Sequence, residues 1–303
     1  MNLNIKILDR KSFPEKLLKI KDAPKRLYAI GNIELLYEDS FGIVGTRKPT
    51  SYGIKNCEEF SKEISLRDIP IVSGMALGID EIAHRTTLEC KGKTIAVLGC
   101  GFGCVYPEEN KGLFEDIIKN NGLVLSEYSE NTEKSSEKFP KRNRIIAAIS
   151  EGVLVVEAAN KSGSLITARK AMKYEKRVFA IPGKIDEKMS VGTNLLIKEN
   201  GILVTNYQEI LNYFPQFANK KRKTISKKDF NIHNKLKLKE DWKSIYCALE
   251  DGAKGIEEIQ LKTGKQIKEL LKILSIMELE DILIKNDNLE YEIKLYIMKG
   301  NEK

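Results

Sequence analysis

Three cations crowded beside an aromatic ring are the residues best suited to chemistry in this 303-residue chain. The stretch FPKRNRII, residues 139–146, places Lys141, Arg142 and Arg144 within four positions, next to Phe139. Cations at a helix start oppose the helix dipole by about 0.3–1 kcal/mol each, and a bound anion would reverse that balance. A basic groove with an aromatic platform suits single-stranded nucleic acid, so the stretch favours a binding site of that kind.

Glycines and serines that follow apolar runs favour contact with phosphate. GIVGTR, residues 42–47, combines a small glycine with an arginine fork that suits phosphate oxygens. SGMALGID, residues 73–80, and SGSLITA, residues 162–168, open helical patterns, where unpaired amides attract an anion. Ordinary strand-to-helix turns and serine helix caps explain the same residues. The candidate anion-binding residues of these turns are Arg47, Ser73, Gly74, Ser162, Gly163 and Ser164.

A hydrolytic site and a dinucleotide site have weaker support in the sequence. Ser73, Asp80 and His84 could form a triad, but the chain has no GxSxG motif, and a serine at a strand end more often caps a helix. The glycines of residues 42–53 do not fit GxGxxG. We therefore predict no catalytic residue.

Cysteines and histidines are too few and too scattered for a metal site or a disulfide framework. Five Cys occur without a CxxC pair, and only two His are present. No apolar run reaches the roughly 18 residues of a membrane span, and the N-terminus has no secretory signal. These features predict a cytoplasmic protein with no metal, no cofactor and no membrane span.

Short apolar runs alternate with helical patterns along most of the chain. Runs of this length that are rich in branched residues indicate strands buried on both faces. The alternation predicts an α/β fold with a doubly wound, mostly parallel sheet, whose ligands bind beyond the carboxyl ends of the strands at the switch point. The runs are residues 41–45, 70–74, 94–99, 122–127, 152–158, 177–183 and 201–206.

Charge and pattern divide the chain into four parts. Residues 1–40 are predicted to be a short lead-in with helical pieces that ends in a turn at LYAIGN, and residues 41–218 to hold the sheet domain. Residues 219–239 form a basic linker with nine Lys and Arg against one Asp, which would add an electrostatic hold on nucleic acid. Residues 240–303 carry ten Lys against fourteen Asp and Glu, and their three helical patterns and terminal hairpin predict a small winged-helix domain.

The motifs and their order resemble those of the DNA-processing protein A family, also called DprA/Smf. The resemblance covers roughly residues 12–215, beginning with FPEKLLKIKDAPKRLYAIGN. One departure is the loop SENTEKSSEK before FPKRNRII, which is usually rich in proline in the family, and an N-terminal helical domain of the sterile-alpha-motif type is not expected here. The matching elements are GTR (45–47), SGMALGID (73–80), GCGFGCVYPEEN (99–110), FPKRNRII (139–146), SGSLITA (162–168) and FAIPG (179–183).

The resemblance implies an extended Rossmann-like sheet domain and a binding protein rather than an enzyme. Members of the family bind single-stranded DNA, shield it, and load the RecA recombinase onto it during natural transformation. They also form homodimers through the sheet domain. By motif position, the DNA pocket of this chain would include Arg47, Lys138, Phe139, Arg142, Asn143, Arg144, Ser162, Gly163 and Ser164.

Two other functions remain as alternatives. A nucleotide-processing enzyme of the phosphoribohydrolase type has a similar fold, but the chain lacks the PGGxGT loop of those enzymes, and Glu157 or Asp80 would have to act in its place. A transcription factor would bind duplex DNA through the winged helix. The net charge of −4 over residues 240–303 argues against that role, since phosphate contacts dominate affinity for DNA. A protein-contact or dimer-stabilising role is the expectation for this module.

Overall fold

The chain consists of two compact units, residues 1–229 and residues 230–303. Each unit has its own cluster of buried apolar side chains, and each is considered by itself. In the computed structural model of the protein, the residues whose placement is described are 4–223, 240–279, 283–286 and 289–293.

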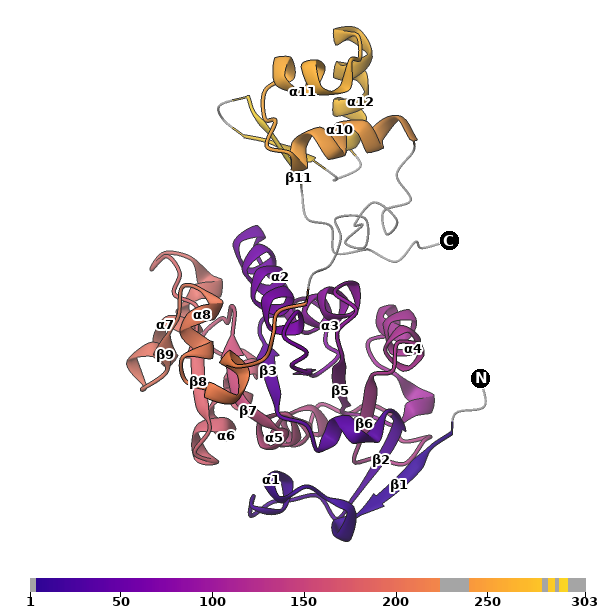
Figure 1. Ribbon diagram of the computed structural model, residues 1–303, viewed down its shortest axis with the longest axis vertical. Helices are drawn as coiled ribbons and strands as arrows, with labels where there is room; N and C mark the ends of the chain where they lie inside the picture. The colour runs from indigo at the N-terminus through magenta and orange to yellow at the C-terminus, as the bar shows by residue number, and fades with distance from the viewer. Residues whose placement is uncertain (1–3, 224–239, 280–282, 287–288, 294–303) are drawn as a thin grey trace. The chain divides into compact units, whose positions relative to one another are not determined.

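A nine-stranded sheet forms the centre of the first unit (Figure 1). Its strand order is β1-β2-β6-β5-β4-β3-β7-β8-β9, and every pairing from β6 to β9 in that order is parallel. The seven runs predicted as strands are β3 to β9, which confirms the mostly parallel α/β sheet. The strands are β1 (Lys6–Asp9), β2 (Arg26–Gly31), β3 (Ser40–Val44), β4 (Ile71–Ser73), β5 (Thr94–Leu98), β6 (Leu123–Ser126), β7 (Ser150–Val155), β8 (Arg177–Ala180) and β9 (Ile202–Leu203).

Helices cover both faces of this sheet, as Figure 1 shows. The apolar sides of α5 and α6 pack on one face, and those of α2 and α3 pack on the other. None of the described helices is long and apolar enough to cross a membrane. The helices of this unit are α1 (Glu15–Leu18), α2 (Ser51–Ser65), α3 (Ile79–Glu89), α4 (Lys111–Lys119), α5 (Lys138–Ile149), α6 (Gly163–Lys173), α7 (Val191–Lys198), α8 (Tyr207–Leu211) and α9 (Pro215–Ala218), with 3₁₀ turns at Arg10–Ser12, Ile33–Leu36, Phe102–Cys104, Glu108–Asn110 and Lys188–Ser190.

The lead-in contributes to the sheet, which corrects the expectation of helical pieces closed by a turn. LYAIGN lies in β2 and its end rather than in a turn, and β2 pairs antiparallel with both β1 and β6. The reason is burial, because Leu27 and Ala29 alternate onto the apolar face and are fully buried there. Only α1 and two 3₁₀ turns represent the predicted helical pieces.

The direction of winding reverses beside β3. From β3 the chain adds β4, β5 and β6 on one side, and then crosses back to place β7, β8 and β9 on the other side. The carboxyl ends of β3 and β7 therefore lie next to each other at a topological switch point, where sheets of this kind bind their ligands. The predicted anion-binding turns follow β3, β4 and β7, so they gather at this edge.

The described residues of the second unit form three helices and a two-stranded hairpin, as predicted for a winged helix. The helices are α10 (Glu240–Glu250), α11 (Ile256–Thr263) and α12 (Ile267–Leu279), and the strands are β10 (Leu283–Lys285) and β11 (Tyr291–Ile293). Gly252 and Gly264 follow α10 and α11 with φ of +90° and +66°, a conformation that favours glycine. Trp242, Ile245 and Leu274 are buried in the core of this unit.

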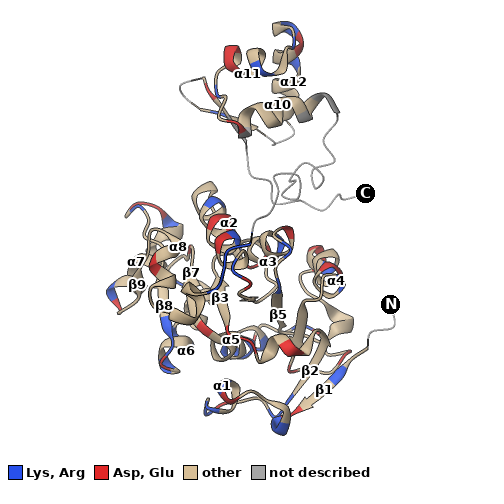
Figure 2. Ribbon diagram, in the orientation of Figure 1, with Lys and Arg blue, Asp and Glu red and all other residues tan. Residues whose placement is uncertain are grey.

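Three basic residues at the start of the predicted linker are bound to α2 and to the turn that follows it. Arg222 donates two hydrogen bonds to the carboxylate of Glu63, at 3.0 and 2.8 Å. Lys223 pairs with Asp68 at 2.8 Å, and Lys220 donates to the Asp68 carbonyl. Figure 2 shows this basic segment beside the acidic end of α2. The electrostatic hold expected of the linker would depend on residues 224–239, which lie outside the described residues.

Candidate nucleic-acid interface

A pocket of about 610 Å³ opens at the switch point, and we call it the switch-point pocket. Its walls are the turns after β3 and β4, the loop around Tyr106, and the starts of α5 and α6. Its volume lies within the range of about 300–1,000 Å³ that is typical of ligand sites. The polar and aromatic residues that line it are Arg47, Asp80, Tyr106, Lys134, Ser135, Ser136, Phe139, Arg142, Asn143, Ser162, Ser164 and Thr167.

Two aromatic rings and two cations form one side of the pocket. The rings of Tyr106 and Phe139 lie 5.8 Å apart between centroids. The guanidinium of Arg47 lies 5.7 Å from the centroid of Phe139, and the ammonium of Lys134 lies 3.9 Å from that of Tyr106. Arg47 is exposed and Phe139 is half-buried, so both can meet a ligand.

The amino end of α6 forms another side. Ser162 caps this helix, because its hydroxyl accepts a hydrogen bond from the Ser164 amide at 3.4 Å. Gly163 is exposed, and a Cβ added there would meet no atom within 4 Å. Asn143 donates from Nδ2 to the Gly163 carbonyl at 3.1 Å, which fixes this end against α5. The result is an open, rigid helix end with the positive side of its dipole toward the pocket.

Arg142 has a structural role that the sequence did not indicate. Helix α5 begins at Lys138, so Arg142 lies in its second turn and not at its start. Arg142 is 5% exposed, and its guanidinium donates hydrogen bonds to the carbonyls of Gly74 and Val97. Burial raises the pKa of the nearby Asp80 carboxyl, and the Arg142 charge opposes that rise.

Glycine permits this close packing. A Cβ on Gly74 would lie 2.7 Å from both Arg142 Nη2 and Asp80 Oδ2. Likewise, a Cβ on Gly45 would lie 2.6 Å from Ile79 Cγ1, although Gly45 also lines the pocket. Helix packing therefore requires both glycines whether or not a phosphate approaches them.

The other basic residues of the motif lie outside the pocket lining. Arg144 Nη2 donates to both carboxylate oxygens of Glu127, at 2.7 and 2.6 Å, and the side chain is mostly buried. Lys138 donates to the Glu133 carbonyl at 2.6 Å, and Lys141 is exposed. These three residues could contact nucleic acid only if the bound strand extended beyond the pocket.

The predicted site residues thus fall into two groups. One group lines the switch-point pocket, and it consists of Arg47, Phe139, Arg142, Asn143, Ser162, Gly163 and Ser164. The other does not, and it consists of Ser73, Gly74, Lys138, Lys141 and Arg144, although Gly74 lines a small adjoining hollow that shares Arg47, Phe139 and Arg142 with the pocket.

The three residues considered as a triad do not form a catalytic relay, because the His84 ring bonds to neither Ser73 nor Asp80, although the Ser73 hydroxyl interacts with the Asp80 carboxylate. Ser73 donates to the Ile43 carbonyl at 2.6 Å, and Asp80 accepts from the Gly74 amide at 3.1 Å. The ring of His84 bonds through Nδ1 to Thr94 at 2.6 Å, and burial lowers the pKa of His84 to about 3. The geometry is that of structural contacts rather than a nucleophile with its histidine base.

Glu157, the candidate acid of a nucleotide-processing enzyme, also has a structural role. Its carboxylate accepts from the amide and the hydroxyl of Thr50, at 2.9 and 2.5 Å, at the start of α2. It is 1% exposed and does not line the pocket, and burial raises its pKa. Among the described residues no group of three His, Cys, Asp or Glu could hold a metal ion.

Sequence reasoning gave no role to Tyr106 or Lys134, although both line the pocket. Tyr106 stands in GCGFGCVYPEEN, one of the motifs that carry the family resemblance, but no residue of that motif was assigned to the site. Lys134 stands in the polar loop before FPKRNRII, where the charge pattern carries no signal.

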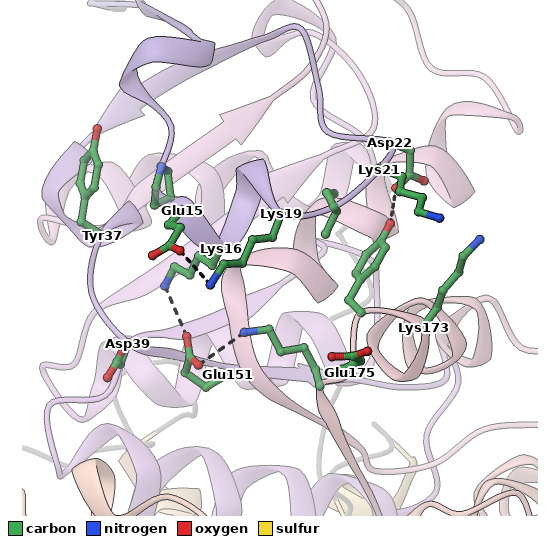
Figure 3. Close-up of a pocket in the computed structure, with 14 residues that line it drawn as sticks. Glu15, Lys16, Lys19, Lys21, Asp22, Tyr37, Asp39, Glu151, Lys173 and Glu175 are labelled. Atoms are coloured by element: carbon green, nitrogen blue, oxygen red, sulfur yellow. Dashed lines mark hydrogen bonds and ion pairs between the residues drawn. The ribbon is translucent and has the colours of Figure 1, made fainter.

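A second, larger hollow of about 920 Å³ lies at the opposite edge of the sheet (Figure 3). Glu151 forms ion pairs there with Lys16 at 3.9 Å and with Lys176 at 3.4 Å. Five lysines and five acidic residues line this hollow in all, so it offers no net charge to a polyanion. It is therefore poorly suited to nucleic acid.

Comparison with known proteins identifies the family of this chain. Residues 4–215 match the family model described as DNA recombination-mediator protein A, which covers more than half of the chain. The chain belongs to the DNA recombination-mediator protein A family. DNA processing protein DprA of Streptococcus pneumoniae is 44% identical over 202 residues, which are 67% of this chain and 71% of that protein.

Other members of the family give the same result. Protein Smf of Escherichia coli is 39% identical over 203 residues, which span 67% of this chain and only 54% of that protein. The X-ray structure of the Streptococcus pneumoniae DprA superposes with a TM-score of 0.66 at 42% identity, covering 70% of this chain and 75% of that one. A Helicobacter pylori DNA processing protein A, described for its single-stranded DNA binding mode, superposes with a TM-score of 0.65 at 34% identity, covering 71% and 97%.

Proposed function

We propose that this chain is a recombination mediator that binds single-stranded DNA in the switch-point pocket. The observation that carries the proposal is the convergence of an aromatic face at Phe139, an exposed arginine at Arg47 and the open amino end of α6. Stacking on the ring suits unpaired bases, and the two positive elements suit the phosphates between them. The single-stranded DNA binding mode described for the Helicobacter pylori family member supports it.

We further propose that the bound strand is protected and passed to the RecA recombinase, as the resemblance to DprA/Smf implies. The natural setting would be the cytoplasm during transformation, with a homodimer as the working form. The role is one of binding without turnover, since Ser73, Asp80, His84 and Glu157 all hold structural partners. The acidic winged-helix unit would serve protein contacts rather than duplex binding.

The mediator role is tested by RecA loading onto DNA that is already coated with single-strand-binding protein. We expect the wild-type chain to shorten the lag of RecA ATP hydrolysis on coated DNA, and the double variant Arg47→Ala/Phe139→Leu to leave that lag unchanged. Naked DNA serves as the control, because RecA nucleates on it without help. A wild-type chain that binds single strands but never shortens the lag would contradict RecA loading and leave only the protective role.

A further inference from the structure

The two rings of the switch-point pocket are each covered by a cation. Lys134 lies 3.9 Å from the centroid of Tyr106, and Arg47 lies 5.7 Å from that of Phe139. The two rings are neighbours, with centroids 5.8 Å apart and planes inclined by 41°. All four side chains line the pocket, and their spatial order along its wall is cation, ring, ring, cation.

We propose that Tyr106 is a second base platform, and that Lys134 and Arg47 cover the two rings only until DNA binds. Bases then stack on the rings, and the two cations move to the phosphates that flank them. This inference rests on the proposed function and assigns a role to two residues, Tyr106 and Lys134, for which the sequence gave none.

The exchange is favourable for both the rings and the cations. A cation over an exposed ring is a weak contact, whereas stacking between a base and an aromatic ring is stronger. A displaced cation gains a charge-assisted contact with phosphate in return. In the DNA-free protein the two cationic side chains cover ring faces that would otherwise be exposed apolar surface.

The rings are held in place and need not be ordered by the ligand. Phe139 packs against Gly99, where a Cβ would lie 2.7 Å from Phe139 Cδ1. Tyr106 is half-buried between that ring and the loop of Lys134. Preorganised platforms of this kind lose little entropy on binding, so each ring contributes most of its stacking energy to affinity.

The test separates the base from the backbone of the DNA. Binding is measured by fluorescence anisotropy with labelled oligo-dT and with an oligonucleotide of equal length whose residues are abasic. We expect Tyr106→Leu to weaken binding of oligo-dT by about 5- to 150-fold, as the loss of one stacked base predicts. It should change binding of the abasic strand by less than about twofold, because no base is there to stack. Tyr106→Phe, which keeps the ring, should bind both strands like the wild type.

Lys134→Met should weaken binding without distinguishing between the two oligonucleotides. It removes a phosphate contact, so it should weaken both oligonucleotides equally and lower the salt slope by about 0.7. Tyr213→Leu is the matched control, because Tyr213 also has a guanidinium over its ring, that of Arg177 at 5.2 Å, and lies outside the pocket lining. It should bind both strands like the wild type.

Two results would overturn the inference. Equal losses on both strands for Tyr106→Leu would mean that the ring only supports the pocket, and no loss on oligo-dT would mean that it meets no base. In either case, the proposed function would still hold if the wild type binds single-stranded DNA and Phe139→Leu does not. A wild-type chain that does not prefer single strands would instead remove the proposed function and this inference together.

Discussion

Replacing Arg142 with methionine is expected to lower the free energy of unfolding of the sheet unit by about 3–5 kcal/mol, the usual cost of leaving a buried charge without its compensating partner. The substitution leaves Asp80 buried without its counter-charge, and it removes the donors to the carbonyls of Gly74 and Val97. Urea denaturation followed by far-ultraviolet circular dichroism measures the loss. The single tryptophan, Trp242, lies in the other unit, so its fluorescence should report little change.

The neighbouring residue gives a matched control for this result. Lys141 carries the same charge one position earlier but is exposed, so Lys141→Met should change stability by no more than about 0.5 kcal/mol. If Arg142→Met were as stable as the wild type and yet lost DNA binding, Arg142 would be a direct phosphate ligand. The structural role derived from its burial would then be wrong.

Placing a carboxylate at Gly163 is expected to separate stability from binding. A side chain there meets no neighbouring atom, and a negative charge at the first position of α6 favours the helix by about 0.3–1 kcal/mol. The same charge stands where the pocket would receive phosphate, so Gly163→Glu should weaken single-stranded DNA binding by about tenfold or more. Thermal unfolding and anisotropy titrations measure the two effects on the same samples.

The neutral variant Gly163→Gln isolates the charge from the added bulk. The difference between the Glu and Gln variants should shrink as salt is raised, because exposed charges are screened. Equal affinities for the two variants at low salt would show that no phosphate approaches the amino end of α6.

The fold was largely predictable because it depends on patterns that are local in the sequence. Buried parallel strands are typically short, apolar and rich in branched residues, and each of the seven predicted runs overlaps a strand of the sheet. The lead-in was mispredicted because β1 and β2 join the sheet through antiparallel pairing, and β2 depends on pairing with β6, which lies about 90 residues later. Such pairing leaves little trace in the local sequence.

The position of the candidate site was predictable from the sequence, but the role of each residue in it was not. The turns after β3 and β7 had to meet at the switch point, which placed Arg47 near Ser162. The contacts of Arg142 and Arg144 depend instead on the direction in which each side chain leaves α5. Arg142 points to a carbonyl of the sheet, and Arg144 points to Glu127. In the sequence they are alike, because both are arginines in one short motif.

The separate roles of these residues explain why a basic cluster precedes an apolar run in FPKRNRII. Arg142 bonds α5 to β5 and to the turn after β4, and Arg144 pairs with Glu127. Lys141 faces solvent, and Phe139 faces the pocket. The cations needed at the pocket itself come from elsewhere, from Arg47 and Lys134.

The measurement that most directly tests the central claim is binding of labelled oligo-dT by the wild-type chain and by Arg47→Ala/Phe139→Leu, across a salt series, with duplex of equal length beside it. We predict a clear preference of the wild type for the single strand. The double variant should bind at least about 30-fold more weakly, since it lacks one stacked base and one phosphate contact. Unchanged affinity in the double variant would contradict the account, and would move the DNA contact away from the switch-point pocket.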